Sequence, residues 1–304
     1  MPRFACLLSL FCAAALAASE PAAPAKPGPD AALKLLKEGN ARFAAGKSEQ
    51  PRTDAARIKL AGQADQGDYA YATVLACSDS RVPVERLFDA GVMDLFVVRV
   101  AGNVVDTDEA GSIEYGLAHV KTPVLVVLGH TQCGAVTAVT QAALGHGHAL
   151  ERNIPPLVAN IGPAVERTRK RFPDLKEGDL IARAIEENVW QGVEDLFMGS
   201  PATRQLVKEG KAKVVGAIYD VGAGGVTWLD EKRAGEILKQ VEKHPDRAMD
   251  PMAAPAHGEP KQENPDSKEP QAKQEKPEAP ARREERQPGD RRRWDSDSNQ
   301  TPGS

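Results

Sequence analysis

The chain has 304 residues, a formal net charge of −4 and 41% hydrophobic residues. Its length allows one large domain or two modest ones. A net charge this small relative to the length indicates no particular class of partner, so we expect no nucleic-acid binding.

The first 17 residues have the pattern of a secretory signal peptide. Arg3 precedes an apolar run at 5–17 that ends in small residues and is too short to span a bilayer. The residue before Cys12 is a phenylalanine, which argues against a lipoprotein cleavage site. We therefore expect an exported protein, periplasmic or secreted, with no membrane span after cleavage, and a linker at 18–29.

The other end of the chain, 243–304, is poor in apolar residues and rich in Pro, Glu, Lys, Arg, Gln and Asp. Such a composition buries too little surface to offset the entropy lost on ordering. We expect a disordered polyampholyte tail, although the basic run Arg291–Arg293 leaves binding to nucleic acid or to an envelope surface as an alternative. The folded domain is then 30–242.

Strand and helix patterns alternate through this domain. A first helix is expected at 30–46, and the second half reads as helices at 155–171, 177–198 and 201–209 followed by two short strands around a glycine turn. Between them, apolar strand runs at 71–76, 95–100 and 123–129 are followed by helices at 83–88, 107–120 and 133–144. This order predicts an α/β fold with a central, mostly parallel β-sheet flanked by helices.

Metal-binding residue types follow two of the predicted strands. Cys77 ends the first strand, His130 ends the third, and Cys133 starts the helix after it, where the helix N-terminus favours a thiolate. The carboxyl ends of parallel strands meet at one edge of the sheet. Two thiolates and an imidazole are a zinc ligand set with a fourth position left over, for which Asp79 is the obvious candidate.

The spacing of Cys77, Asp79 and Arg81 gives these residues one side of an extended chain, so that the guanidinium can pair with the carboxylate. Two other interpretations stay open. Two cysteines in an exported protein form a disulfide more often than a metal site. A zinc site closed by Asp79 would be structural rather than catalytic.

Four stretches, CSDSRVP, DLFVVRVAGNVVD, GSIEYG and VVLGHTQCGAV, resemble the β-class carbonic anhydrases, and the likeness covers about 35–229. The resemblance, to bacterial and exported members, implies Cys77, His130 and Cys133 as zinc ligands. It also implies Asp79 and Arg81 as a catalytic dyad.

The resemblance further implies a substrate pocket lined by Phe96 and Tyr115, with a backbone amide from Gly134. The substrate-orienting glutamine of the family is best matched by Gln63, with Gln66 as second choice, because several residues are inserted before Cys77.

The activity implied is the reversible hydration of carbon dioxide to bicarbonate and a proton, with Zn²⁺-bound hydroxide as the nucleophile. A homodimer or a higher even oligomer is also implied. The alternatives are a noncatalytic zinc protein with a structural Cys₂-His-Asp site, and a redox protein that cycles a disulfide between Cys77 and Cys133.

Overall fold

The computed structural model describes residues 25–252. The expected signal peptide at 1–17 and the expected tail from 253 onward lie outside the described residues. Among the helices within 25–252, none combines the length and apolar character needed to cross a membrane.

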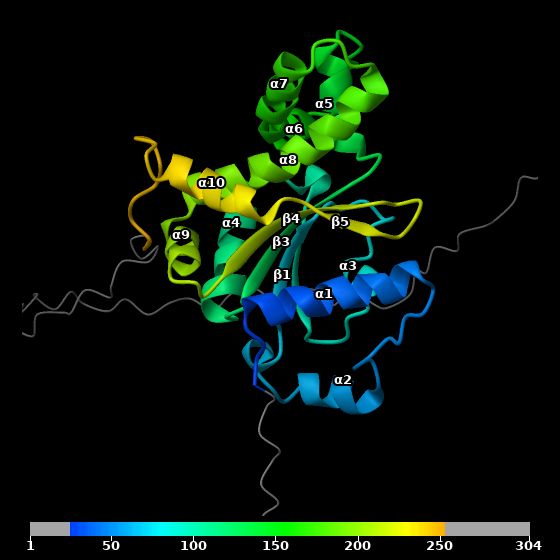
Figure 1. Ribbon diagram of the computed structural model, residues 1–304, viewed down its shortest axis with the longest axis vertical. Coiled ribbons are helices and arrows are strands. Elements are labelled where there is room, and N and C mark those ends of the chain that lie inside the picture. Colours follow the sequence, from blue (N-terminus) through cyan, green and yellow to red (C-terminus); the bar gives the residue numbers. More distant parts are fainter. Residues whose placement is uncertain (1–24, 253–304) are drawn as a thin grey trace, which may run out of the picture. The chain divides into compact units, whose positions relative to one another are not determined.

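A five-stranded sheet forms the centre of the fold, in the order β2-β1-β3-β4-β5 (Figure 1). Four strands are parallel and the last runs antiparallel to β4. The bounds are β1 Ala72–Ala76, β2 Leu95–Arg99, β3 Val124–His130, β4 Lys213–Tyr219 and β5 Val226–Trp228. The expected α/β fold with a mostly parallel sheet is thus confirmed.

Helices cover both faces of the sheet (Figure 1). One face packs against α1 (Pro29–Ala44) and α3 (Val84–Leu87), and the other against α4 (Thr107–Glu114), α8 (Glu177–Gly199) and α10 (Glu231–Val241). The remaining helices are α2 (Ala55–Ala61), α5 (Gly134–Ala143), α6 (Ile154–Val158), α7 (Gly162–Arg171) and α9 (Pro201–Lys208). Single helical turns are η1 (Gln66–Asp68), η2 (Ala101–Asn103), η3 (Tyr115–His119) and η4 (Ala159–Ile161).

The two covered faces explain the uninterrupted apolar runs in the sequence. Every residue of β1 and β3 is buried, and successive side chains point to opposite faces. Val74 packs in the layer of α1, whereas Leu75 packs in the layer of α8. A strand of this kind needs no polar alternation to remain in register.

Two glycines let α8 approach the sheet closely beside the end of β3. A Cβ on Gly129 would lie 2.8 Å from a methyl group of Val189, and a Cβ on Gly216 would lie 2.9 Å from its other methyl group. Val189 of α8 therefore fills the space that two strand side chains would occupy. This packing fixes α8 next to His130, the last residue of β3.

Several elements differ from the sequence-based expectation. The helix expected at 107–120 ends at Glu114, and the chain continues in the wider π-helical turn η3. The helix expected at 155–171 is split into α6, η4 and α7. The sequence patterns did not predict α2 or α10.

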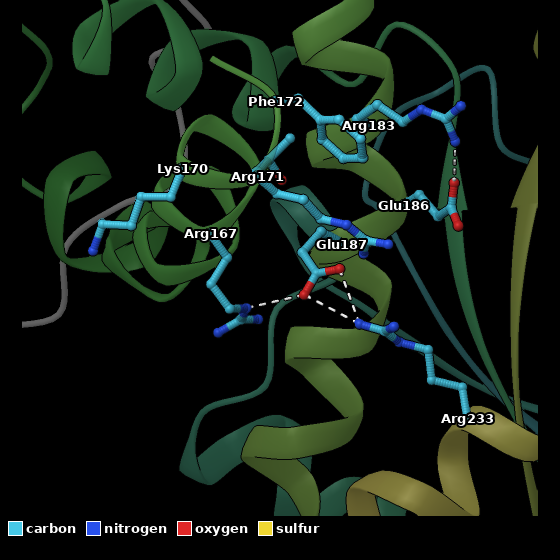
Figure 2. A pocket seen from close by; sticks show the side chains of 9 residues that line it. Arg167, Lys170, Arg171, Phe172, Arg183, Glu186, Glu187 and Arg233 are labelled. Atoms are coloured by element: carbon cyan, nitrogen blue, oxygen red, sulfur yellow. Dashed lines mark hydrogen bonds and ion pairs between the residues drawn. The ribbon is translucent and has the colours of Figure 1, made fainter.

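The chain stays packed on the domain beyond 242, where we expected the tail to begin. The backbone amide of Ala248 donates to the carbonyl of Met198 at 2.9 Å, and the buried guanidinium of Arg204 donates to the carbonyl of Ala248 at 2.5 Å. The last segment described therefore lies against the end of α8. Farther along this side of the sheet, α7, α8 and α10 enclose a cavity of about 570 Å³ (Figure 2).

Candidate metal centre

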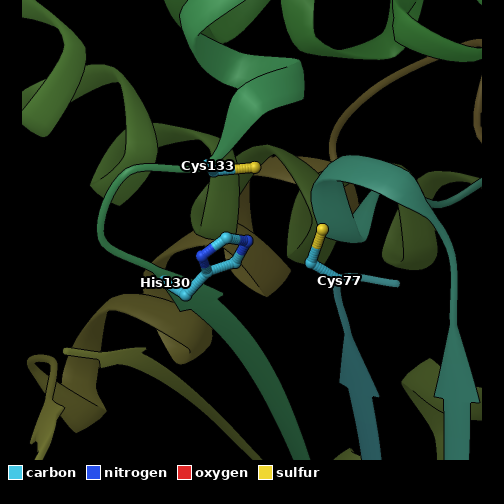
Figure 3. A group of neighbouring side chains, drawn as sticks. All are labelled: Cys77, His130 and Cys133. Carbon is cyan, nitrogen blue, oxygen red and sulfur yellow. The ribbon is translucent and has the colours of Figure 1, made fainter. Parts of the chain in front are cut away.

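Three side chains from two strand ends and one helix start meet at the carboxyl edge of the sheet (Figure 3). Cys77 follows β1 directly, His130 is the last residue of β3, and Cys133 is the N-cap of α5. Their potential ligand atoms all lie within 4.8 Å of one another, and all three residues are buried. The structure thus brings together the three ligands predicted from the sequence.

The imidazole of His130 is oriented for metal binding. Its Nδ1 lies 2.9 Å from the carbonyl oxygen of Thr131, so Nδ1 carries the proton and donates it there. Nε2 then holds a lone pair, is fully buried and has no hydrogen-bond partner among the described residues. A buried acceptor facing two sulfur atoms fits a metal ion, since second-shell bonds of this kind are common in metal sites.

The two thiols interact strongly even without a metal. A hydrogen bond from Cys133 is the main cause that lowers the pKa of Cys77 to about 4, and it raises the pKa of Cys133. The backbone amides of Gly102 and Asp79 also donate to Cys77 Sγ, at 3.3 and 3.4 Å. Cys77 is therefore the thiol that ionises first, and the thiolate is the form that binds metals.

Gly102 supports this thiolate from a conformation that favours glycine, with φ of 77°. A Cβ there would lie 2.8 Å from Ile161 Cδ1. The carbonyl of Gly102 accepts a hydrogen bond of 2.8 Å from the buried amide of Asn188, on α8. Asn188 thereby holds the turn that donates to Cys77.

Asp79 and Arg81 form a two-pronged ion pair at the mouth of the site. Arg81 Nε donates to Asp79 Oδ1 at 2.9 Å, and Arg81 Nη2 donates to Oδ2 at 2.6 Å. These bonds hold the pKa of Asp79 well below its usual range. The carboxylate is therefore ionised at neutral pH.

The pairing arises from a turn and not from the extended chain that we expected. The backbone amide of Arg81 donates to Asp79 Oδ1 at 2.9 Å, and the amide of Val82 donates to the carbonyl of Asp79 at 3.0 Å. The prediction that Cys77, Asp79 and Arg81 share one side of an extended chain was therefore wrong, because β1 ends at Ala76. The side chain of Asp79 caps the turn instead, which brings Arg81 beside it.

Further polar contacts, which the sequence analysis missed, hold this dyad in place. Arg81 donates to Gln132 at both the side-chain oxygen (3.3 Å) and the carbonyl oxygen (3.1 Å). Arg99 donates to the carbonyls of Cys77 (2.9 and 3.0 Å) and Asp79 (2.7 Å). The only sequence signal for Gln132 was its position between two predicted ligands.

Asp79 was also predicted as the fourth metal ligand. Its carboxylate points to Arg81 and is not one of the clustered ligand atoms, which come from Cys77, His130 and Cys133 alone within residues 25–252. The role of Asp79 at the metal remains a prediction.

The predicted pocket residues divide into two groups. Gly134 is the first residue of α5 and lies directly beside Cys133. Phe96 and Tyr115 contact each other, with ring centroids 5.9 Å apart, but Phe96 lies opposite Thr73 in the sheet. That is four residues before Cys77, or about 13 Å along the strand.

Gln63 lies still farther from the metal ligands. Gln63 is exposed just after α2, and its backbone amide donates to the carbonyl of Leu60. The turn η1 separates it from the start of β1. Gln66 is exposed in η1. Within one subunit, the structure thus does not bring Gln63, Phe96 and Tyr115 to the metal centre.

Comparison with known proteins agrees with the fold. Residues 72–226 match the family described as carbonic anhydrase. A carbonic anhydrase of Mycolicibacterium smegmatis is 39% identical over 198 residues, which cover 65% of this chain and 92% of the relative. Carbonic anhydrase 2 of Mycobacterium tuberculosis is 37% identical over 217 residues, with 70% and 98% covered.

Among solved structures, the β-carbonic anhydrase CafA of Aspergillus fumigatus superposes with a TM-score of 0.53 at 26% identity, covering 70% of this chain and 95% of CafA. The β-carbonic anhydrase CcaA gives a TM-score of 0.51 at 25% identity, covering 66% and 88%. The class that these matches define is an α/β carbonic anhydrase, and in this chain three potential metal ligands cluster at the edge of the sheet. The chain belongs to the carbonic anhydrase family, in its β class.

Proposed function

We propose that the protein catalyses the zinc-dependent, reversible hydration of carbon dioxide to bicarbonate and a proton. The observation that carries this proposal is the geometry of three ligand atoms within 4.8 Å, one of them the unpartnered Nε2 of a buried histidine. Family membership supplies the reaction.

Cys77, His130 and Cys133 would hold the ion. A zinc ion held there would supply a hydroxide nucleophile by lowering the pKa of its bound water, less strongly than in a three-histidine site because two thiolates offset its charge. Zinc suits two thiolates and one imidazole better than the harder divalent cations do, since those prefer oxygen ligands. Three protein ligands also leave one position free for the reaction.

The part of Asp79 is to accept a hydrogen bond from the nucleophile and so to aim its lone pair at carbon dioxide. A carboxylate that stays ionised is suited to this role, and the Arg81 ion pair keeps it so. The backbone amide of Gly134, at the start of α5, can donate to an oxygen of the product.

Gln132 is a positioning residue in this scheme. Its two acceptor oxygens hold the guanidinium of Arg81, which in turn holds Asp79. Released from Arg81, the Asp79 carboxylate could take the free position at the metal and block it. The contacts of Gln132 therefore favour the open, active arrangement over the closed one.

The same ion pair argues against a purely structural Cys₂-His-Asp site. In such a site Asp79 would be committed to the metal, and an arginine that competes for its carboxylate would weaken the site. The redox alternative has less support, because a disulfide cycle between Cys77 and Cys133 gives no role to the buried His130 Nε2 that lies in the same cluster.

A homodimer or a larger even oligomer is part of the proposal. Phe96 and Tyr115 lie too far along the sheet to reach the metal of their own subunit. Their predicted pocket role, and that of Gln63, would require a second subunit to bring them to the metal. In this arrangement the pocket exists only in the oligomer.

Two features of the whole chain are also proposed from the sequence. Residues 1–17 direct the protein out of the cytoplasm, to a periplasmic or secreted location in a bacterium. The expected linker at 18–29 is too long, because Lys26 donates to the carbonyls of Val120 and Lys121 and α1 begins at Pro29. The charged residues that follow the domain form a solvated tail.

A stopped-flow carbon dioxide hydration assay on the wild-type protein and on Cys133→Ser, each with metal analysis, tests the function. We expect the wild type to hydrate carbon dioxide and the variant to lose both zinc and activity. A wild-type protein that holds zinc and shows no hydration would refute the catalytic proposal and favour the structural site.

A further inference from the structure

The cavity between α7, α8 and α10 lies apart from the metal centre and has an unusual lining (Figure 2). Its volume of about 570 Å³ is within the range of small-ligand sites. None of the three predicted metal ligands lines it. The lining residues are Arg167, Thr168, Lys170, Arg171, Phe172, Arg183, Glu186, Glu187 and Arg233.

Positive charge dominates this lining. Five cationic side chains face two carboxylates, so the cavity has an excess of three positive charges. Glu194, which is not part of the lining, lies 3.6 Å from Arg167 and offsets one more. Cations gathered in so small a volume repel each other and raise the local concentration of anions.

The carboxylates are already engaged by three of the five cations. Glu187 accepts from Arg167 of α7 at 2.9 Å and from Arg233 of α10 at 3.1 and 3.3 Å (Figure 2). Glu186 pairs with Arg183 at 3.4 Å. Glu187 thus ties α7, α8 and α10 together and forms the back of the cavity.

The other two cations, Lys170 and Arg171 at the end of α7, are exposed. Within residues 25–252 neither of them lies in an ion pair. The charge of Arg171 therefore remains available to an anion that enters the cavity, whereas the Lys170 amine points away from the arginines (Figure 2).

Phe172 holds two of the arginines in a suitable orientation. The guanidinium of Arg171 lies 5.2 Å from the ring centroid, and that of Arg183 lies 5.9 Å from it. An arginine that stacks on an aromatic ring keeps its N–H donors in the plane of the guanidinium free. Such donors match the oxygens of a tetrahedral anion, to which arginine binds in a bidentate manner.

We propose that this cavity is a binding site for a small multivalent oxyanion of the phosphate type, with Arg171 and Arg183 as its main contacts. The site is separate from the reaction at the metal centre and does not depend on the proposed catalytic function. Free phosphate, sulfate and a phosphate group on a larger molecule share the chemistry that would be recognised.

Isothermal titration of the full-length protein at pH 8 tests this site, with inorganic phosphate, sulfate and the monovalent anion nitrate as probes at matched ionic strength. We expect phosphate and sulfate to saturate one site per chain, and nitrate to give no saturable binding. Preference for phosphate over sulfate would indicate a phosphorylated ligand, and equal binding would indicate recognition of charge and shape alone.

The key variant is Lys170→Gln/Arg171→Gln, which changes two exposed side chains. Its affinity for phosphate should fall at least about tenfold, because charged hydrogen bonds are lost. The matched control is Lys34→Gln/Lys59→Gln, which makes the same change of charge at exposed positions on α1 and α2. The control should bind phosphate as the wild type does.

Three results would overturn the proposal. The wild type could show no saturable binding of phosphate or sulfate. The cavity variant could bind as tightly as the wild type, or the α1 and α2 control could lose as much affinity as the cavity variant. The single variant Arg171→Gln, with a smaller loss expected, provides the same comparison if the double variant is unstable.

Discussion

Arg81 binds both carboxylate oxygens of Asp79, with Nε 2.9 Å from Oδ1 and Nη2 2.6 Å from Oδ2. The pair follows the buried strand β1 by only a few residues. The backbone amide of Arg81 donates to the Asp79 carboxylate and so fixes the orientation of that carboxylate in the turn. The local sequence therefore supplies both the charge and its orientation.

Replacing Asp79 with asparagine removes the charge and keeps the shape. We expect kcat/KM for carbon dioxide hydration to fall about 100-fold or more, the usual range for a lost acid–base partner. Zinc content should not change, because Asp79 is not among the clustered ligand atoms. Asp174→Asn, at an exposed turn, is the control and should keep full activity.

Loss of zinc from Asp79→Asn would instead mean that this carboxylate is a permanent ligand. In that case the structural interpretation of the site would gain support over the catalytic one.

Gln132→Ala removes one of the two acceptors that hold Arg81. We expect activity to fall about three- to tenfold at neutral pH, the effect of one hydrogen bond to a charged group. The pH–activity profile should also shift to higher pH, since the freed carboxylate competes better for the metal when less hydroxide is available. A stopped-flow assay from pH 6 to 9 measures both effects.

Gln141→Ala is the matched control for this prediction. Gln141 lies on α5, which follows Gln132 in the chain, and donates to Glu177, away from the dyad. If the two variants had the same pH profile, Gln132 would have no positioning role.

Gly39→Ala tests the close packing of α1 on α3. The added Cβ would lie 1.9 Å from the carbonyl oxygen of Phe88, and neither backbone can move freely. We expect the free energy of unfolding to fall by about 3 kcal/mol, as in other overpacked sites. Urea denaturation followed by circular dichroism measures the change.

The control for this packing is Gly235→Ala in α10, where nothing lies within 4 Å of the added Cβ. Both changes improve helix propensity, so Gly235→Ala should stabilise the protein by about 0.5–1 kcal/mol. A neutral or favourable effect of Gly39→Ala would show that α1 can move away from Phe88.

Asp195 makes stability depend on pH in the direction opposite to most carboxylates. Burial on α8 raises its pKa to about 6, and nearby Glu194 adds to the effect. The unfolded chain releases this proton near its usual pKa of 3.8, so the folded state binds the extra proton between those values. Asp195 therefore lowers stability as pH rises from about 4 to 6.

Asp195→Asn should remove this penalty. We expect the variant to be more stable than the wild type by up to ~2 kcal/mol at pH 8, with little difference near pH 4. Its amide could also donate to the unpartnered oxygen of Gln191. Urea denaturation of both proteins at the two pH values checks the sign, and a difference that is larger at pH 4 would contradict it.

Much of the sheet was predictable because its central strands β1 and β3 are buried on both faces. The runs that became β1, β2 and β3 are continuous and apolar, and each is followed by a helix pattern. The three predicted ligands were equally visible, since residues at the ends of parallel strands must meet at one edge.

The helices α2 and α10 were not predicted, for different reasons. The helix α2 has seven residues, none of them buried, so its sequence has no apolar stripe to detect. By contrast, α10 buries Ala234, Ile237, Leu238 and Val241, at helical spacing after the N-cap Asp230, and this signal was present in the sequence.

The contacts that position the dyad could not be foreseen from spacing alone. Gln132 reaches Arg81 through a backbone conformation with φ of 59°, which no pattern in the sequence specifies. Asn188 meets Gly102 across 86 residues of chain, because α8 packs over two glycines of the sheet. Tertiary packing determines both contacts.

The zinc content of the purified mature protein, measured together with its free thiols, tests the central claim most directly. We predict one zinc ion per chain, which is lost on chelation together with the hydration of carbon dioxide. A metal-free protein in which Cys77 and Cys133 form a disulfide would contradict the account.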